Sequence, residues 1–314
     1  MPTINRVVYF AQSGTVRTVG TGGSYGPSYL LPISSANIEV SRPIEAITSF
    51  GKFSSLNTAQ TNLTTCKSTL KAYLGTGIAL GTGSTGALGS GIDAAALNAL
   101  INATSSSSGI EISVMPGGFV MTGILTNLGI DMSMGGFATV DLGFAGIGKP
   151  TLYGPTSNIV SESNSTMSIA PITTISIGTS GAMSGTYASS IKFSYDLPTD
   201  TLSALGDDPN AYQGSSRLIS SIASKPPYKA TVSVEGHGVD PTRTDALSAL
   251  VYNIGNIGIQ LPNAKVSSRS MNNAAGQVSA TYSFTAEDVG ATITSVQLTS
   301  FDPTQAAALP TYGA

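Results

Sequence analysis

The same spaced pattern of residues occurs twice in this chain, and each copy follows the same earlier landmark. The earlier landmark in the first copy consists of Ile38, Val40, Ser41, Phe50 and Gly51. Its counterpart in the second copy consists of Ile191, Phe193, Ser194, Leu205 and Gly206. The later pattern in the first copy consists of Leu125, Asn127, Ile130, Gly136, Ala138, Val140, Leu142 and Phe144. Its counterpart in the second copy consists of Leu261, Asn263, Val266, Gly276, Val278, Ala280, Tyr282 and Phe284. Because both landmarks recur in the same order, the sequence predicts two copies of one domain in tandem.

The two copies differ in length, and a glycine-rich segment accounts for the difference. The earlier landmarks, Ile38 and Ile191, lie 153 residues apart, whereas the later ones, Leu125 and Leu261, lie 136 apart. The segment 75–109 is almost wholly Gly, Ala, Ser, Thr and Leu, which is typical of an inserted surface segment. We therefore predict a first domain at 1–155, with an insert at 75–109, and a second domain at 156–314.

Strict alternation of apolar and polar residues predicts half-buried strands, because successive side chains of a strand point to opposite faces. The clearest runs are 128–134, 138–144 and 278–284. Their polar members are Asp131, Ser133, Thr139, Asp141, Ser279, Thr281 and Ser283. Further strands are predicted at 38–41, 112–115, 172–177, 191–195, 230–235 and 291–298.

Helices are expected to be few. The spacing of Leu56, Leu63, Cys66 and Leu70 predicts a helix over 56–74, followed by glycine as a C-terminal stop. A second helix is expected to start with Asp93 as its N-cap, and a third is expected over 244–252. The chain is thus predicted to be mainly β, with antiparallel strands.

Composition favours a subunit of an assembly. Only 10% of the 314 residues are charged, the net charge is −3, and glycine reaches 36 residues. A chain with so few charges has little electrostatic repulsion between its copies. No apolar run is long enough for a membrane-spanning helix, and the N-terminal apolar run after Arg6 is too short for a secretory signal, so we expect the chain to stay in the cytosol until it assembles.

Motifs for cofactor or metal chemistry are weak. Residues 81–86 match G-x-G-x-x-G, but the sequence after Gly86 cannot support the helix that a dinucleotide fold requires. Cys66 and His237 are the only cysteine and histidine, so neither a zinc site nor a disulfide framework is expected. No cofactor is predicted.

No catalytic centre is predicted either. His237 lies between two glycines, and no serine nucleophile elbow accompanies it. The acidic run of Asp207 and Asp208 precedes Pro209 and Asn210, which is the composition of a turn. We interpret the chain as a non-enzyme.

The basic residues are scattered, and this excludes a nucleic-acid-binding platform. There are 14 basic and 17 acidic residues, and the basic ones form no cluster. Tight binding of DNA depends on basic groups that neutralise phosphates together. A wall of hydroxyls with occasional carboxylates would let DNA pass without holding it.

The repeated unit resembles the tail tube domain of long-tailed bacteriophages. The resemblance rests on an Ile-x-aromatic-Ser strand, a loop ending in Leu-Gly, a strand such as 230–235, and a final hairpin with glycine at its turn. In the second half it covers 190–195, Leu205 and Gly206, 226–228, 230–235, 261–266 and 280–284. In the first half it covers 37–41, Phe50 and Gly51, the segment around Cys66, and 126–146, with the glycine-rich insert as a departure.

The resemblance implies two tandem tail-tube-like β-sandwich or barrel domains with one or two short helices, whose strands complete a larger barrel on assembly. Family rings are commonly six domains around, so a trimer with pseudo-sixfold symmetry is expected, with rings stacked along the tail and in contact with other tail proteins. The seven polar positions Asp131, Ser133, Thr139, Asp141, Ser279, Thr281 and Ser283 become candidates for facing the lumen. Segments 16–29 and 75–109 are expected to be arms and loops that reach the next ring or solvent.

The implied function is that of a structural virion protein, assembled in the host cytoplasm, whose channel passes DNA during ejection without membrane contact. Two alternatives remain open. One is a phage capsid decoration or tail-tip protein. The other is a carbohydrate-binding or adhesin-like β-sandwich module, although the chain has no Trp to serve as a sugar platform.

Overall fold

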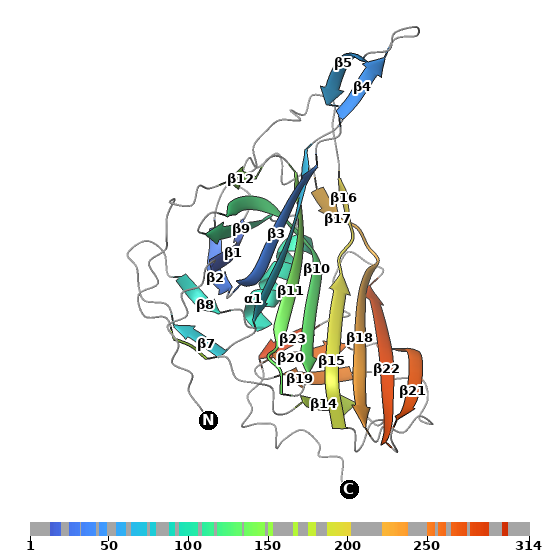
Figure 1. The fold of residues 1–314 in the computed structure, drawn as a ribbon. Helices are drawn as coiled ribbons and strands as arrows, with labels where there is room; N and C mark the ends of the chain where they lie inside the picture. The colour runs from blue at the N-terminus through green and yellow to red at the C-terminus, as the bar shows by residue number, and fades with distance from the viewer. Residues whose placement is uncertain are drawn as a thin grey trace.

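The computed structural model shows a mainly β molecule with antiparallel sheets and, in the part of the chain it describes, one helix (Figure 1). The described residues are 13–19, 25–31, 33–41, 44–48, 55–60, 64–73, 76–79, 88–91, 94–105, 109–115, 118–133, 135–147, 150–152, 166–168, 175–179, 187–201, 222–237, 250–254, 257–261, 265–274, 277–288 and 297–300. The prediction of a mainly β, antiparallel chain is confirmed.

A run of eight neighbouring strands forms the centre of the molecule. Its spatial order is β3 (Ile33–Ser41), β6 (Thr65–Tyr73), β11 (Thr139–Ile147), β10 (Phe119–Ser133), β15 (Tyr187–Asp196), β18 (Tyr228–His237), β22 (Gln277–Asp288) and β21 (Lys265–Ala274). All seven pairings between these neighbours are antiparallel. Figure 1 shows the run extending from β3 on one side to β21 on the other.

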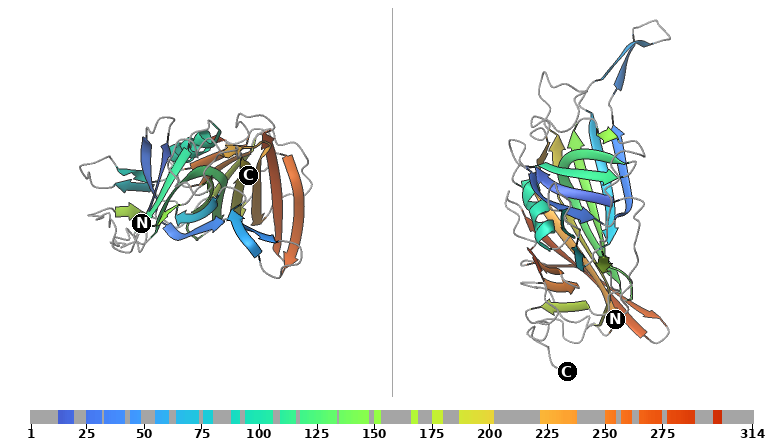
Figure 2. Two further views of the ribbon diagram at one scale, coloured as in Figure 1. Left: turned by 90° about the horizontal axis from the view of Figure 1, so that it is seen from above. Right: turned by 90° about the vertical axis from the view of Figure 1, so that its left-hand side faces the viewer.

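Strand β10 is long because it belongs to two parts of the sheet. Its first residues pair with β9 (Gly109–Met115) and with β12 (Thr151–Leu152), and this part ends at Gly123. From Ile124 onward it pairs with β11, and from Asn127 also with β15. Strand β9 continues the first part through β1 (Ser13–Val19), β2 (Tyr25–Leu31) and β8 (Leu88–Gly91). In Figure 2 this layer crosses one face of the eight-stranded run.

The core lies between that layer and the run of strands. Helix α1 (Ala94–Ser105) contributes Leu97, Leu100 and Ile101, which pack in the same buried cluster as Val16 of β1 and Leu142 of β11. The helix begins at Ala94, whereas Asp93, its predicted N-cap, lies outside the described residues. Burial of this apolar surface is the main term that holds the two layers together.

Smaller sheets complete the fold. A four-stranded sheet of β14 (Ile175–Thr179), β19 (Leu250–Ile254), β20 (Ile257–Leu261) and β23 (Gln297–Ser300) lies against β15 and α1. The hairpin of β4 (Ile44–Thr48) and β5 (Ser55–Gln60) projects away from the body between β3 and β6 (Figure 2). The pair of β16 (Thr199–Thr201) and β17 (Ile222–Ser224) occupies the same place in the chain between β15 and β18. Strand β7 (Thr76–Ala79) pairs with β13 (Thr166–Ser168).

The predicted helix at 56–74 is wrong, because β5 and β6 occupy this segment. Cys66 and Leu70 are four residues apart, a spacing that fits a strand as well as a helix when Ser68 and Ala72 face the same side. The segment is also rich in threonine, whose branched side chain favours strands. The helix predicted over 244–252 is wrong at its end, where β19 begins at Leu250, and its start lies outside the described residues.

Three further expectations need correction. Segment 16–29 is not an arm in its described residues, because β1 and β2 belong to the main sheet and Val16 is fully buried. Segment 75–109 is more than an inserted loop, since α1 supplies core residues from within it. In addition, Leu261 ends β20 in the four-stranded sheet, so it does not correspond to Leu125 of β10, and Asn263 lies outside the described residues.

Candidate functional site

One face of the eight-stranded run is polar from end to end. On β10 and β11 the side chains of Leu128, Ile130 and Val140 are buried, whereas the residues between them are half-buried or exposed. All seven positions predicted to face a lumen lie on this polar face: Asp131, Ser133, Thr139, Asp141, Ser279, Thr281 and Ser283. We call this surface the polar face.

Cross-strand register joins the two groups of predicted positions. A single row across five strands contains Thr139, Asp131, Lys192, Ser233 and Ser283. Directly paired residues of antiparallel strands point to the same side of a sheet. The positions around Asp131 and those around Ser283, which are about 150 residues apart in the chain, therefore share one continuous surface.

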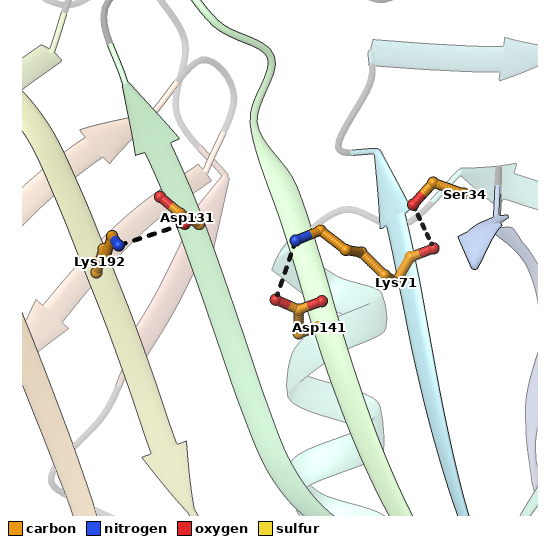
Figure 3. A network of polar contacts seen from close by, with 5 residues as sticks. All are labelled: Ser34, Lys71, Asp131, Asp141 and Lys192. Atoms are coloured by element: carbon orange, nitrogen blue, oxygen red, sulfur yellow. Dashed lines mark hydrogen bonds and ion pairs between the residues drawn. The ribbon is translucent and has the colours of Figure 1, made fainter. Parts of the chain in front are cut away.

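Lysines and carboxylates alternate on the polar face. The Lys71 Nζ lies 3.8 Å from the Asp141 Oδ2, and the Lys192 Nζ lies 3.9 Å from the Asp131 Oδ2, as Figure 3 shows. These four side chains are between 39% and 69% exposed, so each pair contributes at most about 1 kcal/mol to folding. Their main effect is to cancel charge locally on the polar face.

Asn127 connects the two strands at the middle of the run. Its Nδ2 donates a hydrogen bond to the Asp196 Oδ1 at 2.7 Å and another to the Ser194 Oγ at 3.2 Å. Both acceptors belong to β15, which is the first strand contributed by the second half of the chain. The pairing of β10 with β15, which we call the internal seam, thus has side-chain bonds on its polar side in addition to the backbone ladder.

A tight turn sets the register of β10 and β11. The amide of Gly136 donates to the Ser133 carbonyl oxygen at 3.0 Å, and Gly135 has a φ of 75°, a value that residues with a side chain rarely adopt. Next to this turn the rings of Phe137 and Tyr73 meet edge to face, with centroids 6.2 Å apart. The glycine of the repeated pattern is the next residue, Gly136, where a Cβ would lie 2.6 Å from the Ser133 Oγ.

The opposite face of the run is the apolar core. On the two central strands it contains Ile130 and Phe193, which are opposite each other and only 1% and 2% exposed. Ile191, Tyr195 and Val232 continue the same buried surface on the neighbouring positions. A sheet with one buried and one polar face can close around a channel only if the polar face turns inward.

The two outer strands of the run each have one unpaired edge among the described strands. Strand β3 pairs only with β6, and β21 pairs only with β22. They are 9 and 10 residues long and contain no proline. Each also exposes a large apolar side chain, since Val40 is 41% exposed and Met271 is 57% exposed. Long, proline-free edges with unpaired backbone groups are surfaces that readily accept another strand.

The other residues weighed in the sequence do not form a chemical site in the described structure. Cys66 is a buried residue of the core that forms no disulfide, and His237 is the last residue of β18. Residues 81–86 and the turn of Asp207 and Asp208 lie outside the described residues. Across the described residues, no group of three or more His, Cys, Asp or Glu side chains could hold a metal ion, and the helix that is described cannot cross a membrane.

Sequence reasoning missed the lysines of the polar face and the two open edges. Lys67 and Lys71 of β6, Lys192 of β15 and Lys229 of β18 all share this face, although they look scattered along the chain. The lysines of 65–73 alternate with residues that are buried, and this alternation could have shown that they share one face. The pattern is informative only once that segment is assigned to a strand.

No family model matches the chain, and no curated protein sequence matches it.

Proposed function

We propose that this chain is a structural subunit of a bacteriophage tail tube. Copies would join into stacked rings around a channel that passes DNA during ejection. The observation that carries this proposal is an eight-stranded antiparallel sheet with one polar face, one core face and two unpaired edges among the described strands. Such a sheet satisfies its outer backbone groups by joining another copy of itself.

The order of the strands supports the proposed duplication. The first half contributes β3, β6, β11 and β10 to the run, and the second half contributes β15, β18, β22 and β21. In each set the last two strands appear in reverse chain order. A small two-stranded sheet, β4 with β5 or β16 with β17, follows the first strand of each set. We therefore propose that each half is one copy of a tube-forming unit.

A channel requires several chains. Eight strands closed into a barrel enclose little more than their own side chains, whereas sixteen or more leave an aqueous channel. Three chains would place about 24 strands around the axis, and at a spacing of about 4.8 Å and a tilt of about 40° the backbone diameter would be roughly 50 Å. With side chains lining the inside, an opening of roughly 40 Å would remain. A trimer in which each chain supplies two similar units would therefore enclose an open channel.

The polar face is suited to line that channel. It carries many hydroxyls, and Lys71 and Lys192 are paired with Asp141 and Asp131. DNA binding is driven by basic groups that neutralise phosphates, and these two lysines already have acidic partners. A lining of this kind neither holds DNA nor strongly repels it. We propose that the protein acts within the virion tail after assembly in the host cytoplasm, together with other tail proteins, and that it has no catalytic role.

Electron microscopy of the purified chain at high concentration tests this function. We expect rings with an axial opening, which stack into tubes of constant diameter. A capsid decoration protein would instead give small closed oligomers without tubes, and a carbohydrate-binding module would stay monomeric and bind polysaccharide. Monodisperse monomers under all conditions would refute the proposal.

A further inference from the structure

We propose that β21 of one copy pairs with β3 of the next copy in one defined register, with Met271 opposite Ile38. The inference rests on the proposed function and names the contact through which rings would form. The partner is a second copy of this chain. We call this contact the external seam.

The internal seam provides the template. Strands β10 and β15 pair antiparallel over seven residue pairs, from Asn127 with Asp196 to Ser133 with Ser190. At its centre Ile130 lies opposite Phe193, and both side chains are buried. On the polar side of the same seam, Asp131 lies opposite Lys192.

Strand β21 matches β10 through the position of an irregularity in pairing. In the first half, Leu125 lies opposite Phe144 and the register then shifts before Asn127. In the second half, Val266 lies opposite Phe284 and the register then shifts before Ser268. Such bulges occupy defined places in a sheet, so they fix the alignment of the two strands. Five residues beyond each starting point, Ile130 corresponds to Met271.

Strand β3 matches β15 through a bulge and through its place. Each is the first strand of its half in the eight-stranded run, and each precedes a two-stranded insertion. The pairing of β3 with β6 shifts between Ile33 and Ser35, and the pairing of β15 with β18 shifts between Ala188 and Ser190. Aligning these bulges makes Ile38 the counterpart of Phe193, two residues away from the match of Ile38 with Ile191 that the sequence suggested. The pair corresponding to Ile130 and Phe193 is therefore Met271 and Ile38.

The exposure of Met271 and Val40 agrees with this assignment. Met271 is 57% exposed, and Val40, two residues from Ile38 on the same face of β3, is 41% exposed, whereas their counterparts Ile130 and Tyr195 are 1% and 0% exposed. Among the described residues, Phe137 is the other exposed large apolar side chain, and it lies in a turn away from both edges. Two positions that are buried in the internal seam are thus open where the corresponding partner strand is missing.

The direction of the strands also fits. The run contains an even number of strands, and all seven pairings are antiparallel. Strand β21 therefore runs opposite to β3, and placing β21 of one copy beside β3 of the next continues the same alternation. In this register Asn272 lies opposite Asn37 on the polar face, where the internal seam has Asp131 and Lys192.

Cysteine cross-linking tests the register in the full chain. The variant with Asn37→Cys and Asn272→Cys is expected to form disulfides between chains under oxidation, because directly opposed residues have the short Cβ separation that a disulfide needs. The matched control carries Glu39→Cys and Asn272→Cys, which is displaced by two residues and should not cross-link. The native Cys66 does not interfere, since it is buried on the opposite face of β6.

The outcomes separate this inference from the proposed function. Cross-linking of the Asn37 variant but not of the Glu39 variant supports the register. If electron microscopy shows rings and the Glu39 variant alone cross-links, or neither variant does, the register is wrong while the tube function stands. If the unmodified chain gives only monomers, both proposals fail.

A charge placed in the external seam gives a second, independent test. Val40→Lys or Met271→Lys should weaken ring formation at least about 10-fold, because a buried apolar contact is lost and a charge is desolvated. Both side chains are exposed in the single chain, so folding measured by circular dichroism should be retained. Phe137→Lys is the matched control and should leave ring formation unchanged. Equal ring formation by Met271→Lys and Phe137→Lys would overturn the inference.

Discussion

Gly123 marks the point where β10 changes partners, and we predict that Gly123→Ala destabilises the chain by at least about 2 kcal/mol. Pairing with β9 ends at Gly123, and pairing with β11 begins at Ile124. A Cβ at this position would lie 2.2 Å from the Ala145 carbonyl oxygen and 2.8 Å from its carbon. Ordinary contacts of this kind are about 3.5 Å, so the two strands would have to separate by about 1 Å.

The size of the effect follows from the nature of the obstacle. The atoms in the way belong to the backbone of β11, which is held by its ladders to β10 and β6, so they cannot rotate aside as a flexible side chain can. Gly129→Ala in the same strand is the matched control. Its Cβ would meet the Asp141 Cβ at 3.4 Å, an ordinary contact, and we expect a change within about 0.5 kcal/mol.

Urea-induced unfolding followed by circular dichroism measures both variants. All samples need the same protein concentration, because assembly would make apparent stability depend on concentration. The midpoint of Gly123→Ala should fall clearly while the slope stays constant, and that of Gly129→Ala should stay near the unmodified value. Free energies of unfolding that agree within about 0.5 kcal/mol for the two variants would refute the reasoning.

Three further predictions concern single side chains. Leu70→Ala, at a fully buried position of β6, should lower the free energy of unfolding by about 2–5 kcal/mol, and a loss below about 1 kcal/mol in urea unfolding would contradict its core position. Asn127→Ala removes the hydrogen bond to Asp196 at the internal seam and should cost about 1 kcal/mol, measured in the same way, whereas no loss would show that this bond contributes nothing. Asp141→Asn breaks the half-exposed ion pair with Lys71 and should change stability by less than about 1 kcal/mol, so a larger loss by thermal unfolding would mean that the pair is more important than its exposure implies.

The alternation of apolar and polar residues along single strands was predictable from the sequence, and this alternation placed the seven candidate lumen positions on one face. A strand such as β11 carries the evidence in its own residues, because Val140, Leu142 and Phe144 are apolar and the residues between them are not. Segment 56–74 failed because Cys66 and Leu70 fit both a helical and an extended period. Local spacing alone cannot decide between the two.

Pairing between distant strands was not predictable in the same way. The match of Leu261 with Leu125 followed letter spacing, whereas the structure places Val266 opposite Phe284 as Leu125 lies opposite Phe144. Register depends on bulges and on neighbours far away in the chain, which a single sequence does not reveal. The unpaired edges of β3 and β21 emerged only from the complete strand order.

The most direct test of the account is an electron cryomicroscopy map of the assembled protein, viewed along its axis. We predict a closed sheet that continues from β21 of one chain into β3 of the next, with Asp131 and Ser283 facing the channel. A map in which the sheet stops at these two strands, or in which the polar face points away from the axis, would contradict the central claim.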